Sequence, residues 1–480
     1  MNPPVPAQRR PSASPSSAGP CDVNDIHSRL NVTRVARILR PRSVGGLQEA
    51  VRAAADAGTA LSFCGGRHAM GGQQFALRVP LVDMTSLDRV IDIDSDRGLV
   101  TVEAGIDWVG LVQHLLWASP DQRGWGIIQK QTGADRLTLG GALAANIHGR
   151  GLALGPIVGD VESFDLVDGR GRVLTCSRTE NPRLFALAIG GYGLVGPVVR
   201  VTLRLCRRHK VQRRVRMARV GDLRALFEQR GREGYEYGDF QFAIDPSSHE
   251  FLDAGIFSCY RPVAAETIIP EDQRVLSLRE WQYLLRLAHT AKSQAFAEYA
   301  RHYMATDGQY YWSDTHQLSL YPDGYHEQLD VDLGATAQGS EMISELYVQR
   351  SALERFMAAV RADARRHEVD IVYGTIRAIE RDDESVLAWA RERWACIVFN
   401  LHVDHTPAGL AKAARDFRRL IDRAAELGGS YYLTYHRWAT AEQVRACHPR
   451  IAEFLAEKRR FDPAGIFTSD WYTHHVRLLS

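Results

Sequence analysis

The chain has 480 residues, 45% of them hydrophobic and 24% charged, which are the proportions of a globular protein rather than a disordered one. The net charge is only +2 and no basic tract stands out, so a nucleic-acid partner is not expected. No stretch approaches the ~18 consecutive apolar residues of a membrane-spanning helix, so no membrane partner is expected either. The seven cysteines lack the spacing of a disulfide framework or a zinc site, which favours a cytoplasmic protein without a metal.

Residues 1–22 are expected to form a disordered tail, because proline, serine and alanine dominate this stretch. The pair Arg9-Arg10 is not followed by an apolar segment, so the sequence does not predict an export signal.

The pattern from residue 43 to residue 116 predicts a β-α-β-β-β order. In residues 47–57 apolar positions recur at helical spacing, with Ser43 as a fair N-cap and Gly58 as the stop. Short strands are expected at residues 61–63, 79–84, 87–93 and 99–103, and a second helix at residues 109–116.

A glycine-rich loop directly follows the first of these strands. Residues 61–74 read LSFCGGRHAMGGQQ, with four glycines and one histidine, His68. Glycine lets another group approach the backbone closely, and successive N–H groups in such a loop can form a concave anion site. The loop therefore predicts a site for a diphosphate.

This loop resembles the flavin loop of the vanillyl-alcohol-oxidase-type flavoproteins, whose FAD domain is named after p-cresol methylhydroxylase. Members carry G-x-G-H-S or G-x-R-H-S where this chain reads Gly65-Gly66-Arg67-His68-Ala69, with Ala69 in place of the usual serine. The resemblance implies that the loop wraps the FAD diphosphate and that His68 bonds covalently to the flavin 8α-methyl carbon. The alternative is a loop histidine that only lies beside a phosphate site. The FAD-binding residues expected here are Cys64, Gly65, Gly66, Arg67, His68, Ala69, Gly72 and Gln73.

A second glycine loop, residues 132–151, is similar to the T-V-G-G…G-x-H-G run that lines the diphosphate and flavin ring in the same family. A helix of small residues is expected to begin at Gly140-Gly141 and to end at Asn146, with His148 in a structural role. Some relatives hold FAD by a second bond from a cysteine just before this point, but residues 133–136 contain none, so at most one attachment is predicted. The FAD-binding residues expected here are Gly133, Gly140, Gly141, Ala145, Asn146, His148 and Gly149.

The adenine end of FAD is expected near a third glycine-rich stretch, residues 189–196. In the family the equivalent turn and the following strand lie against the adenine, which points to Gly191 and to the backbone of Val198. The basic run 207–210 that ends this strand is interpreted as a solvated linker. The other elements expected in this part are strands at residues 158–167 and 172–176, joined by an Asp-Gly turn, and a helix at residues 181–188.

From residue 211 the pattern changes to long amphipathic helices alternating with short strands, which predicts an α+β domain with helices over one face of a sheet. The aromatic segment 308–325 is interpreted either as a loop over the active site or as a packing or oligomer contact. The helices are expected at residues 220–230, 276–303, 351–367 and 407–427, and the strands at residues 240–244, 343–349, 370–379, 394–402 and 430–436.

The C-terminal stretch 461–470 reads FDPAGIFTSD and resembles the F-D-P-x-G-x-F-x-S-D ending of the same flavoproteins, which closes the FAD pocket and suggests Asp470 as a contact. The expected organisation is a p-cresol-methylhydroxylase-type FAD domain of two subdomains (residues 30–206), a substrate or cap domain (residues 211–445) and a C-terminal segment (residues 446–480) that returns to the FAD domain.

The substrate side is most similar to the sugar-alcohol and aldonolactone oxidases. Their Q-S-E-Y strand resembles the segment around Glu345, and their E-I-R segment resembles Thr375-Ile376-Arg377, with threonine in place of the acid. Their inward histidine corresponds to Val398, and their catalytic lysine lies where this chain has Tyr435-His436-Arg437. These departures leave polyol or aldonolactone specificity open.

One cluster, residues 400–405, could be a metal site if His402, Asp404 and His405 converged. In a strand, however, residues 402 and 404 share one face and residue 405 lies on the other, so an imidazole facing the flavin is the better interpretation. The catalytic candidates are Arg377, His402, Tyr435 and Glu345.

Together these motifs predict an FAD-dependent oxidoreductase that oxidises the CH–OH group of a small, sugar-like molecule, with oxygen as the expected electron acceptor. The alternatives are a dehydrogenase that uses a quinone or cytochrome, or a flavin-binding scaffold without activity. A nicotinamide site is not expected, since no G-x-G-x-x-G follows the first strand. The oligomeric state is left open.

Overall fold

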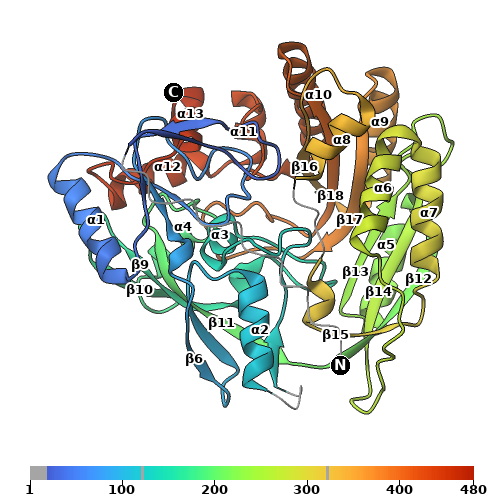
Figure 1. Ribbon diagram of the computed structural model, residues 1–480, viewed down its shortest axis with the longest axis horizontal. Helices are drawn as coiled ribbons and strands as arrows, with labels where there is room; N and C mark the ends of the chain where they lie inside the picture. Colours follow the sequence, from blue (N-terminus) through green and yellow to red (C-terminus); the bar gives the residue numbers. More distant parts are fainter. Residues whose placement is uncertain (1–18, 120–123, 320–323) are drawn as a thin grey trace.

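The computed structural model describes residues 19–119, 124–319 and 324–480, so most of the expected tail lies outside the described residues. Helices and four separate sheets give an α+β architecture. Figure 1 shows the sheets of the N-terminal part on one side, a long sheet from the later part of the chain on the other, and the C-terminal helices over the N-terminal part. No helix in the described ranges is both long and apolar enough to cross a membrane.

The N-terminal part begins with the antiparallel pair β1–β2, and a small parallel sheet of order β3–β5–β4 follows, in which β4 leads into the first glycine loop. Helix α1 follows β3 and begins after Ser43, whose side chain accepts a hydrogen bond from the N–H of Gly46, as the sequence predicted. Its buried face packs with Val82 and Phe467 in one hydrophobic cluster. The bounds are β1 (Cys21–Val23), β2 (Thr33–Val35), β3 (Ile38–Leu39), α1 (Val44–Asp56), β4 (Ser62–Cys64) and β5 (Leu81–Asp83).

A six-stranded antiparallel sheet of order β10-β9-β11-β7-β6, with β8 paired to β11, forms the rest of this part. The Asp-Gly hairpin is present: the N–H of Gly171 donates to the carbonyl of Asp168 over 2.9 Å, and Gly171 has φ +71°. The bounds are β6 (Val90–Asp94), β7 (Leu99–Glu103), α2 (Trp108–Ala118), β8 (Trp125–Ile127), α3 (Leu139–Ala145), β9 (Val161–Val167), β10 (Val173–Ser177), α4 (Pro182–Ala188) and β11 (Val198–Arg207).

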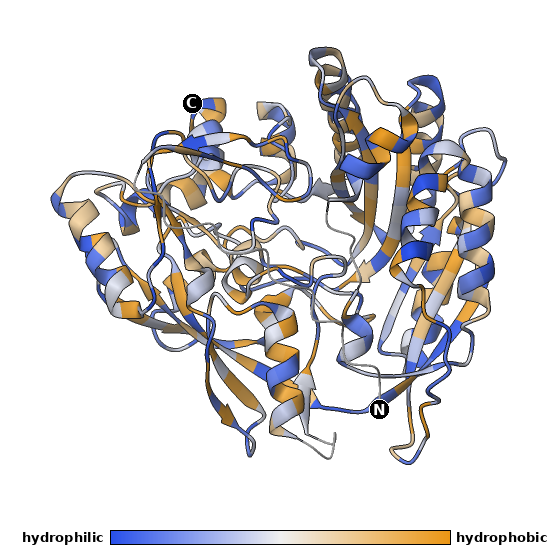
Figure 2. Cartoon of the chain, in the orientation of Figure 1, coloured by the Kyte–Doolittle hydropathy of each residue, from blue (hydrophilic) through white to orange (hydrophobic). Residues whose placement is uncertain are grey.

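The long sheet has eight strands in the order β15-β12-β14-β13-β17-β18-β16-β19, with antiparallel neighbours throughout. Figure 2 shows hydrophobic residues concentrated along its strands and hydrophilic residues along the outer helices. The bounds are β12 (Lys210–Arg219), β13 (Tyr237–Phe242), β14 (Ala254–Val263), β15 (Tyr310–Trp312), β16 (Gly339–Gln349), β17 (Ile371–Ile379), β18 (Trp394–Asp404) and β19 (Ser430–Tyr431).

Helices lie over both faces of this sheet, so the prediction of helices over one face is wrong. One face packs against α9 and α10 through buried residues such as Met342 and Phe417. The other face carries α6 and α7, which stand over a cavity. The bounds are α5 (Leu223–Arg232), α6 (Leu278–Thr290), α7 (Lys292–Met304), α8 (Tyr325–Leu333), α9 (Leu353–Arg366) and α10 (Pro407–Ala425).

Three expected elements differ for reasons that depend on distant contacts. The single helix at residues 276–303 is two helices, because Ala291 leaves helical geometry (φ −153°, ψ 68°) where Lys292 reaches Asp370 at 2.8 Å. The prediction that residues 207–210 form a solvated linker is wrong. Strand β11 ends at Arg207 and β12 begins at Lys210, and the buried Arg208 between them forms an ion pair with Asp314 at 2.6 Å. Strand 430–436 is shortened to β19, since only Ser430 and Tyr431 pair with β16.

The C-terminal segment packs against the N-terminal part of the chain. The N–H of Leu61 donates to the carbonyl of Ile466 over 2.6 Å, and the N–H of Thr468 donates back to Leu61 over 3.0 Å. Asp462 holds the turn by accepting hydrogen bonds from the N–H groups of Ile466 and Phe467, each at 2.9 Å. The remaining helices are α11 (Ala441–Cys447), α12 (Ile451–Phe461) and α13 (Asp470–Leu479). The domain boundaries themselves stay a prediction.

We predict that Asp462→Ala lowers the free energy of unfolding by about 3–5 kcal/mol, because it leaves the buried ammonium of Lys458 without its partner. Urea unfolding followed by circular dichroism measures the change. Arg460→Ala, an exposed residue on the same helix, is the matched control and should have little effect. Equal stability of the two variants would contradict the structural role of Asp462.

Candidate active site

One large cavity, of about 680 Å³, lies between the two glycine loops and the open face of the long sheet. Its walls come from the first glycine loop, the second glycine loop, strands β13, β16, β17 and β18, and helices α6 and α7. Glycines and small residues line the side toward the N-terminal part, while aromatic and charged side chains line the side toward the long sheet.

The two glycine loops touch each other, and the contact requires glycine on the first loop. A Cβ at Gly65 would lie 2.0 Å from Oγ1 of Thr138, and one at Gly66 would lie 2.4 Å from the carbonyl oxygen of Arg136. Thr138 in turn caps α3 by accepting from the N–H of Gly141 over 3.2 Å. Glycine is therefore what lets the two loops pack against each other. The backbone of both glycines also lines the cavity, which fits a dinucleotide that approaches the main chain closely.

His68 lines the cavity and is held by a second histidine. Its Nδ1 lies 2.8 Å from Nε2 of His27. Burial and the neighbouring His27 ring lower the pKa of His68 well below its usual value, although the backbone of Arg136 raises it in part. The imidazole is therefore neutral near pH 7, and a neutral imidazole keeps one nitrogen with a free lone pair.

Helix α3 brings small side chains to the cavity and ends in a left-handed residue. Asn146 has φ +50°, and its side-chain amide donates to Asp382 over 2.8 Å. Ala144 and Ala145 lie on the cavity wall, and the N–H of Tyr192 donates to the carbonyl of Ala144 over 3.0 Å. The expected helix of small residues is thus present, and it starts and stops within one residue of its predicted bounds.

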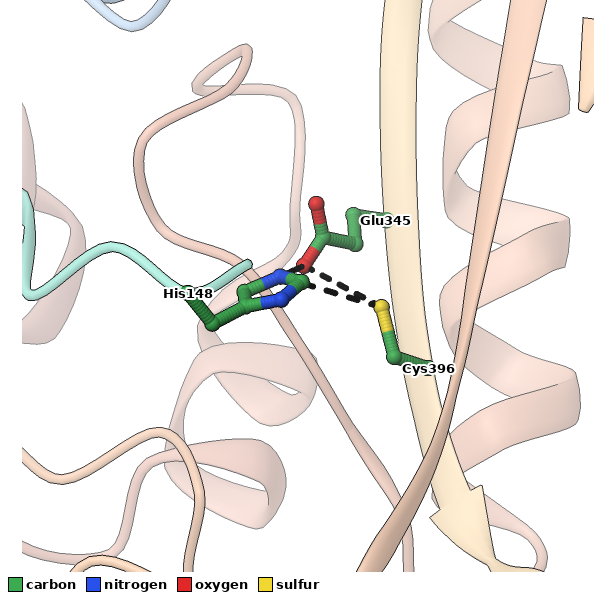
Figure 3. Close-up of side chains that lie close together, drawn as sticks. All are labelled: His148, Glu345 and Cys396. Atoms are coloured by element: carbon green, nitrogen blue, oxygen red, sulfur yellow. Dashed lines mark hydrogen bonds and ion pairs between the residues drawn. The ribbon is translucent and has the colours of Figure 1, made fainter. Parts of the chain in front are cut away.

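Glu345 of β16 is the centre of a buried hydrogen-bond cluster at the boundary between the two parts of the chain (Figure 3). His148 places Nε2 2.7 Å from one carboxylate oxygen, to which Tyr347 and the Cys396 thiol (3.4 Å) also donate. Tyr435 donates to the other oxygen over 3.2 Å. Burial raises the pKa of Glu345, but His148, Tyr347 and Arg377 together bring it below its usual value, so the group is a carboxylate.

The same three residues, His148, Glu345 and Cys396, are the one group of possible metal ligands found close together in the described part of the chain. Nε2 of His148 and the carboxylate oxygen are 2.7 Å apart, which is the separation of a hydrogen bond. Two ligands at about 2.0–2.2 Å from a tetrahedral metal would lie farther apart than this. We therefore interpret the cluster as a hydrogen-bonded carboxylate.

The strand register places Glu345 in the same row as Thr375, the residue that replaces the acid of the E-I-R segment. Thr375 pairs with Val398, and Val398 pairs with Glu345, so the three form one row across β17, β18 and β16. Alternation along a strand points the whole row to the cavity face. The acid thus lies two strands away from Thr375 in the same row. Arg377 reaches the cavity from β17, and its side chain donates to the hydroxyl of Thr132.

Eleven of the eighteen predicted FAD-binding residues line this cavity: Cys64, Gly65, Gly66, Arg67, His68, Ala69, Gln73, Gly133, Gly141, Ala145 and His148. The walls formed by the described residues do not include Gly72, Gly140, Asn146, Gly149, Gly191, Val198 or Asp470. Asn146 bonds to Asp382, and Asp470 accepts hydrogen bonds from Leu77 and Thr33, so both side chains are used within the protein. Contact of Gly191 and Val198 with an adenine stays a prediction.

Of the four catalytic candidates, Arg377, Tyr435 and Glu345 meet in the cavity, whereas His402 does not line it. Strand β18 continues to Asp404, so His402 lies beyond the cavity, with its ring 5.1 Å from that of His289 and its Nε2 3.4 Å from Asp404. The expectation that His402 faces the flavin is therefore wrong. The aromatic segment 308–325, left open by the sequence, forms strand β15 and also lines the cavity through Tyr311 and His316; its Tyr321 lies outside the described residues.

Sequence reasoning missed several residues of the site, above all His27, Arg150 and Arg213. His27 precedes the expected FAD domain, and no local pattern marks it. The sequence does give a signal for Arg213. It lies two residues from both Val211 and Val215, so in a strand it shares their buried face. A charged residue in an apolar alternation indicates a functional or paired group.

Comparisons with known proteins agree with this geometry. Residues 35–177 match the family model described as "FAD binding domain". Over 449 residues the chain is 24% identical to the L-gulono-1,4-lactone dehydrogenase of Mycobacterium tuberculosis (strain H37Rv), a match that spans 92% of this chain and 95% of that protein. Two proteins of Oryza sativa subsp. japonica match shorter segments. L-galactono-1,4-lactone dehydrogenase 2, mitochondrial, is 30% identical over 39% of this chain and 30% of its own length. Cytokinin dehydrogenase 3 is 33% identical over 29% of this chain and 27% of its own length.

The protein is an FAD-dependent oxidoreductase, and this confirms the class that the glycine loops predicted. Within that class its residues 35–177 match an FAD binding domain of the p-cresol-methylhydroxylase type, and over most of its length the chain is similar to a protein named L-gulono-1,4-lactone dehydrogenase.

We predict that His402→Ala leaves kcat and KM within about twofold of the parent enzyme, because no part of the side chain reaches the cavity. Steady-state kinetics with any alcohol that reduces the flavin provide the measurement. A loss of several orders of magnitude would instead place His402 in the reaction.

Proposed function

We propose that FAD occupies the cavity with its diphosphate on the first glycine loop and that His68 bonds covalently to the flavin. The support is the neutral imidazole of His68, fixed through Nδ1 by His27 beside a backbone cradle that only glycine permits. In this proposal two subdomains at residues 30–206 carry the cofactor. We also propose a cytoplasmic location, for which the seven unpaired cysteines are the support.

We further propose that the enzyme oxidises a CH–OH group of a small, sugar-like substrate. Bound FAD supplies the chemistry by accepting a hydride at N5 of its ring. The names of two relatives, L-gulono-1,4-lactone and L-galactono-1,4-lactone dehydrogenase, support an alcohol on a sugar skeleton. Thr375 and Val398 replace groups that polyol and aldonolactone oxidases carry, so the specificity of this chain is its own.

The observation that carries this proposal is the meeting of Arg377, Tyr435 and Glu345 on one wall of the cavity. The guanidinium of Arg377 is placed to stabilise the negative charge that develops on the substrate oxygen. Burial and the Glu345 carboxylate raise the pKa of Tyr435 well above its usual value, so its hydroxyl is neutral and donates to Glu345. Tyr435 can therefore receive the substrate proton while it passes its own to Glu345.

Oxygen is the electron acceptor that we propose, with formation of hydrogen peroxide. A dehydrogenase that passes electrons to a quinone or cytochrome is the second candidate, because the curated relatives are named dehydrogenases. Mixing the reduced enzyme with air in a stopped-flow instrument separates the two: an oxidase is reoxidised within its turnover time. If no alcohol bleaches the flavin under anaerobic conditions, the third alternative, an inactive flavin scaffold, would hold.

We predict that acid precipitation of the purified protein leaves the yellow colour in the pellet, because a covalent bond survives denaturation. In His68→Ala the colour should move to the supernatant. Colour that stays in the pellet of this variant would point instead to Cys64 or His148, the other residues of the two glycine loops that line the cavity and carry a sulfur or ring nitrogen. His114→Ala, an exposed histidine of α2, is the control and should keep the colour in the pellet. Colour in the supernatant of the parent protein would contradict covalent attachment.

We predict that Tyr435→Phe lowers the rate of anaerobic flavin reduction by about 10²–10⁴-fold, because it removes the group that receives the substrate proton. The loss should fall on kcat rather than on KM. Tyr283→Phe, an exposed tyrosine of α6, should reduce its flavin at the parent rate. An unchanged rate in Tyr435→Phe would remove this residue from the mechanism.

A further inference from the structure

A second charged cluster in the cavity is made by Arg150 of the second glycine loop, Arg213 of β12 and Asp239 of β13, around the ring of Tyr260 on β14. Both guanidinium groups stand over this ring, at 4.7 Å for Arg150 and 5.6 Å for Arg213. Arg213 also lies 4.4 Å from the ring of Tyr303 on α7. All of these side chains line the cavity, and nothing in the proposed oxidation uses them.

The positive charge of this cluster is not balanced. Arg150 forms an ion pair with Asp239 at 3.4 Å. Arg213 forms no ion pair with any described carboxylate; it donates to the hydroxyl of Ser258 over 2.9 Å, and its Nε has no hydrogen-bond partner. Two guanidinium groups thus share one carboxylate in a place where Arg213 is only 6% exposed. Buried charges in proteins are normally paired, so one negative charge is missing here.

A neighbouring histidine does not change this count. His316 lies against Tyr260, with ring centres 4.7 Å apart. Burial and the nearby Arg150 hold the pKa of His316 well below its usual value, so it is neutral. The cluster therefore has a net charge of one positive unit.

Arg213 is the member of this cluster that lies farthest from the reacting end of the cavity, since Asp239 is on β13, which pairs with β17. Strands β13 and β14 lie between β17, which carries Arg377, and β12, which carries Arg213. Three strand spacings correspond to about 14 Å between the two backbones. Arg213 reaches toward the reacting end through its hydrogen bond to Ser258 on β14. A ligand that touches both ends has the length of a small sugar rather than that of a two-carbon acid.

We propose that Arg213 and Arg150 form an anion subsite that selects a substrate carrying a carboxylate at the end opposite to the oxidised carbon. This substrate class, a hydroxylated sugar acid, rests on the proposed alcohol oxidation in the same cavity. A carboxylate supplies the single negative charge that the cluster lacks, and its two oxygens suit the fork of an arginine. A phosphate would bring up to two charges and over-compensate the cluster. The tyrosine rings around the site provide flat surfaces for a sugar ring.

The test measures binding to the holoenzyme by isothermal titration calorimetry, which does not depend on turnover. The ligands are D-glucuronate and D-galacturonate, the neutral parents D-glucose and D-galactose, and D-glucose 6-phosphate. At least one uronate should bind about tenfold or more tightly than its parent sugar and more tightly than the phosphate. Equal binding of acids and parent sugars, binding of neither, or tightest binding of the phosphate would overturn the carboxylate subsite.

Three variants locate the effect. Arg213→Gln should remove the preference for the acid, whereas Asp239→Asn, which leaves more net positive charge, should strengthen it. Arg216→Gln removes an exposed arginine of the same strand and should bind like the parent. The preference for the acid is expected to fall in Arg213→Gln and to rise in Asp239→Asn. Misfolding would instead weaken binding in both variants, so the two explanations are separated. A preference that survives in Arg213→Gln would overturn the assignment.

The outcomes also separate this inference from the proposed oxidation. If a uronate binds tightly but no alcohol bleaches the flavin, the anion subsite stands and the oxidation fails. If neutral sugars bleach the flavin as well as their acids do, the oxidation stands and the subsite fails.

Discussion

The hydrogen bond between His148 and Glu345 joins the two parts of this protein at the place where its chemistry is expected. His148 ends the second glycine loop, and Glu345 lies in the middle of the long sheet. The carboxylate is buried, so it is stable in its charged form only while His148, Tyr347 and Tyr435 donate to it. Removal of one partner from such a buried group costs about 3–5 kcal/mol. The loop and the sheet are therefore fixed relative to each other by one charged group.

The contact between the two glycine loops sets the other side of the cavity. Gly65 and Gly66 have no room for a Cβ, because the side chain of Thr138 lies against Gly65 and the carbonyl oxygen of Arg136 lies against Gly66. Such a wall recognises a diphosphate by its N–H groups and depends little on side chains. The wall toward the long sheet instead consists of charged and aromatic side chains, and the identities of these side chains decide what binds. A wall built from backbone therefore tolerates changes of side chain that would alter what the substrate wall binds.

The same difference determines how much the sequence could predict. The glycine loops, the capped helix α1 and the Asp-Gly hairpin are local patterns, and the structure has them at or within a few residues of the expected positions. The role of Glu345 beside Thr375 depends on the register of three strands, which no local pattern reveals. His402 was misplaced because the length of β18 is fixed by pairing with β16. Arg208 was read as solvated because its partner, Asp314, is 106 residues away.

The threonine at position 375 has a further consequence for the charge of the whole cavity. With Thr375 on β17, Arg377 has no carboxylate beside it on its own strand. It pairs with Cys396, in the row next to that of Glu345, and helps to lower the pKa of Glu345. Glu345 already accepts hydrogen bonds from four donors, so it cannot fully neutralise Arg377 as well. Arg377 at one end and the Arg150–Arg213 cluster at the other thus leave both ends of the substrate wall electropositive. A positive charge at both ends of a cavity attracts anionic molecules before any specific contact forms, and this is the charge distribution that the proposed anion subsite requires.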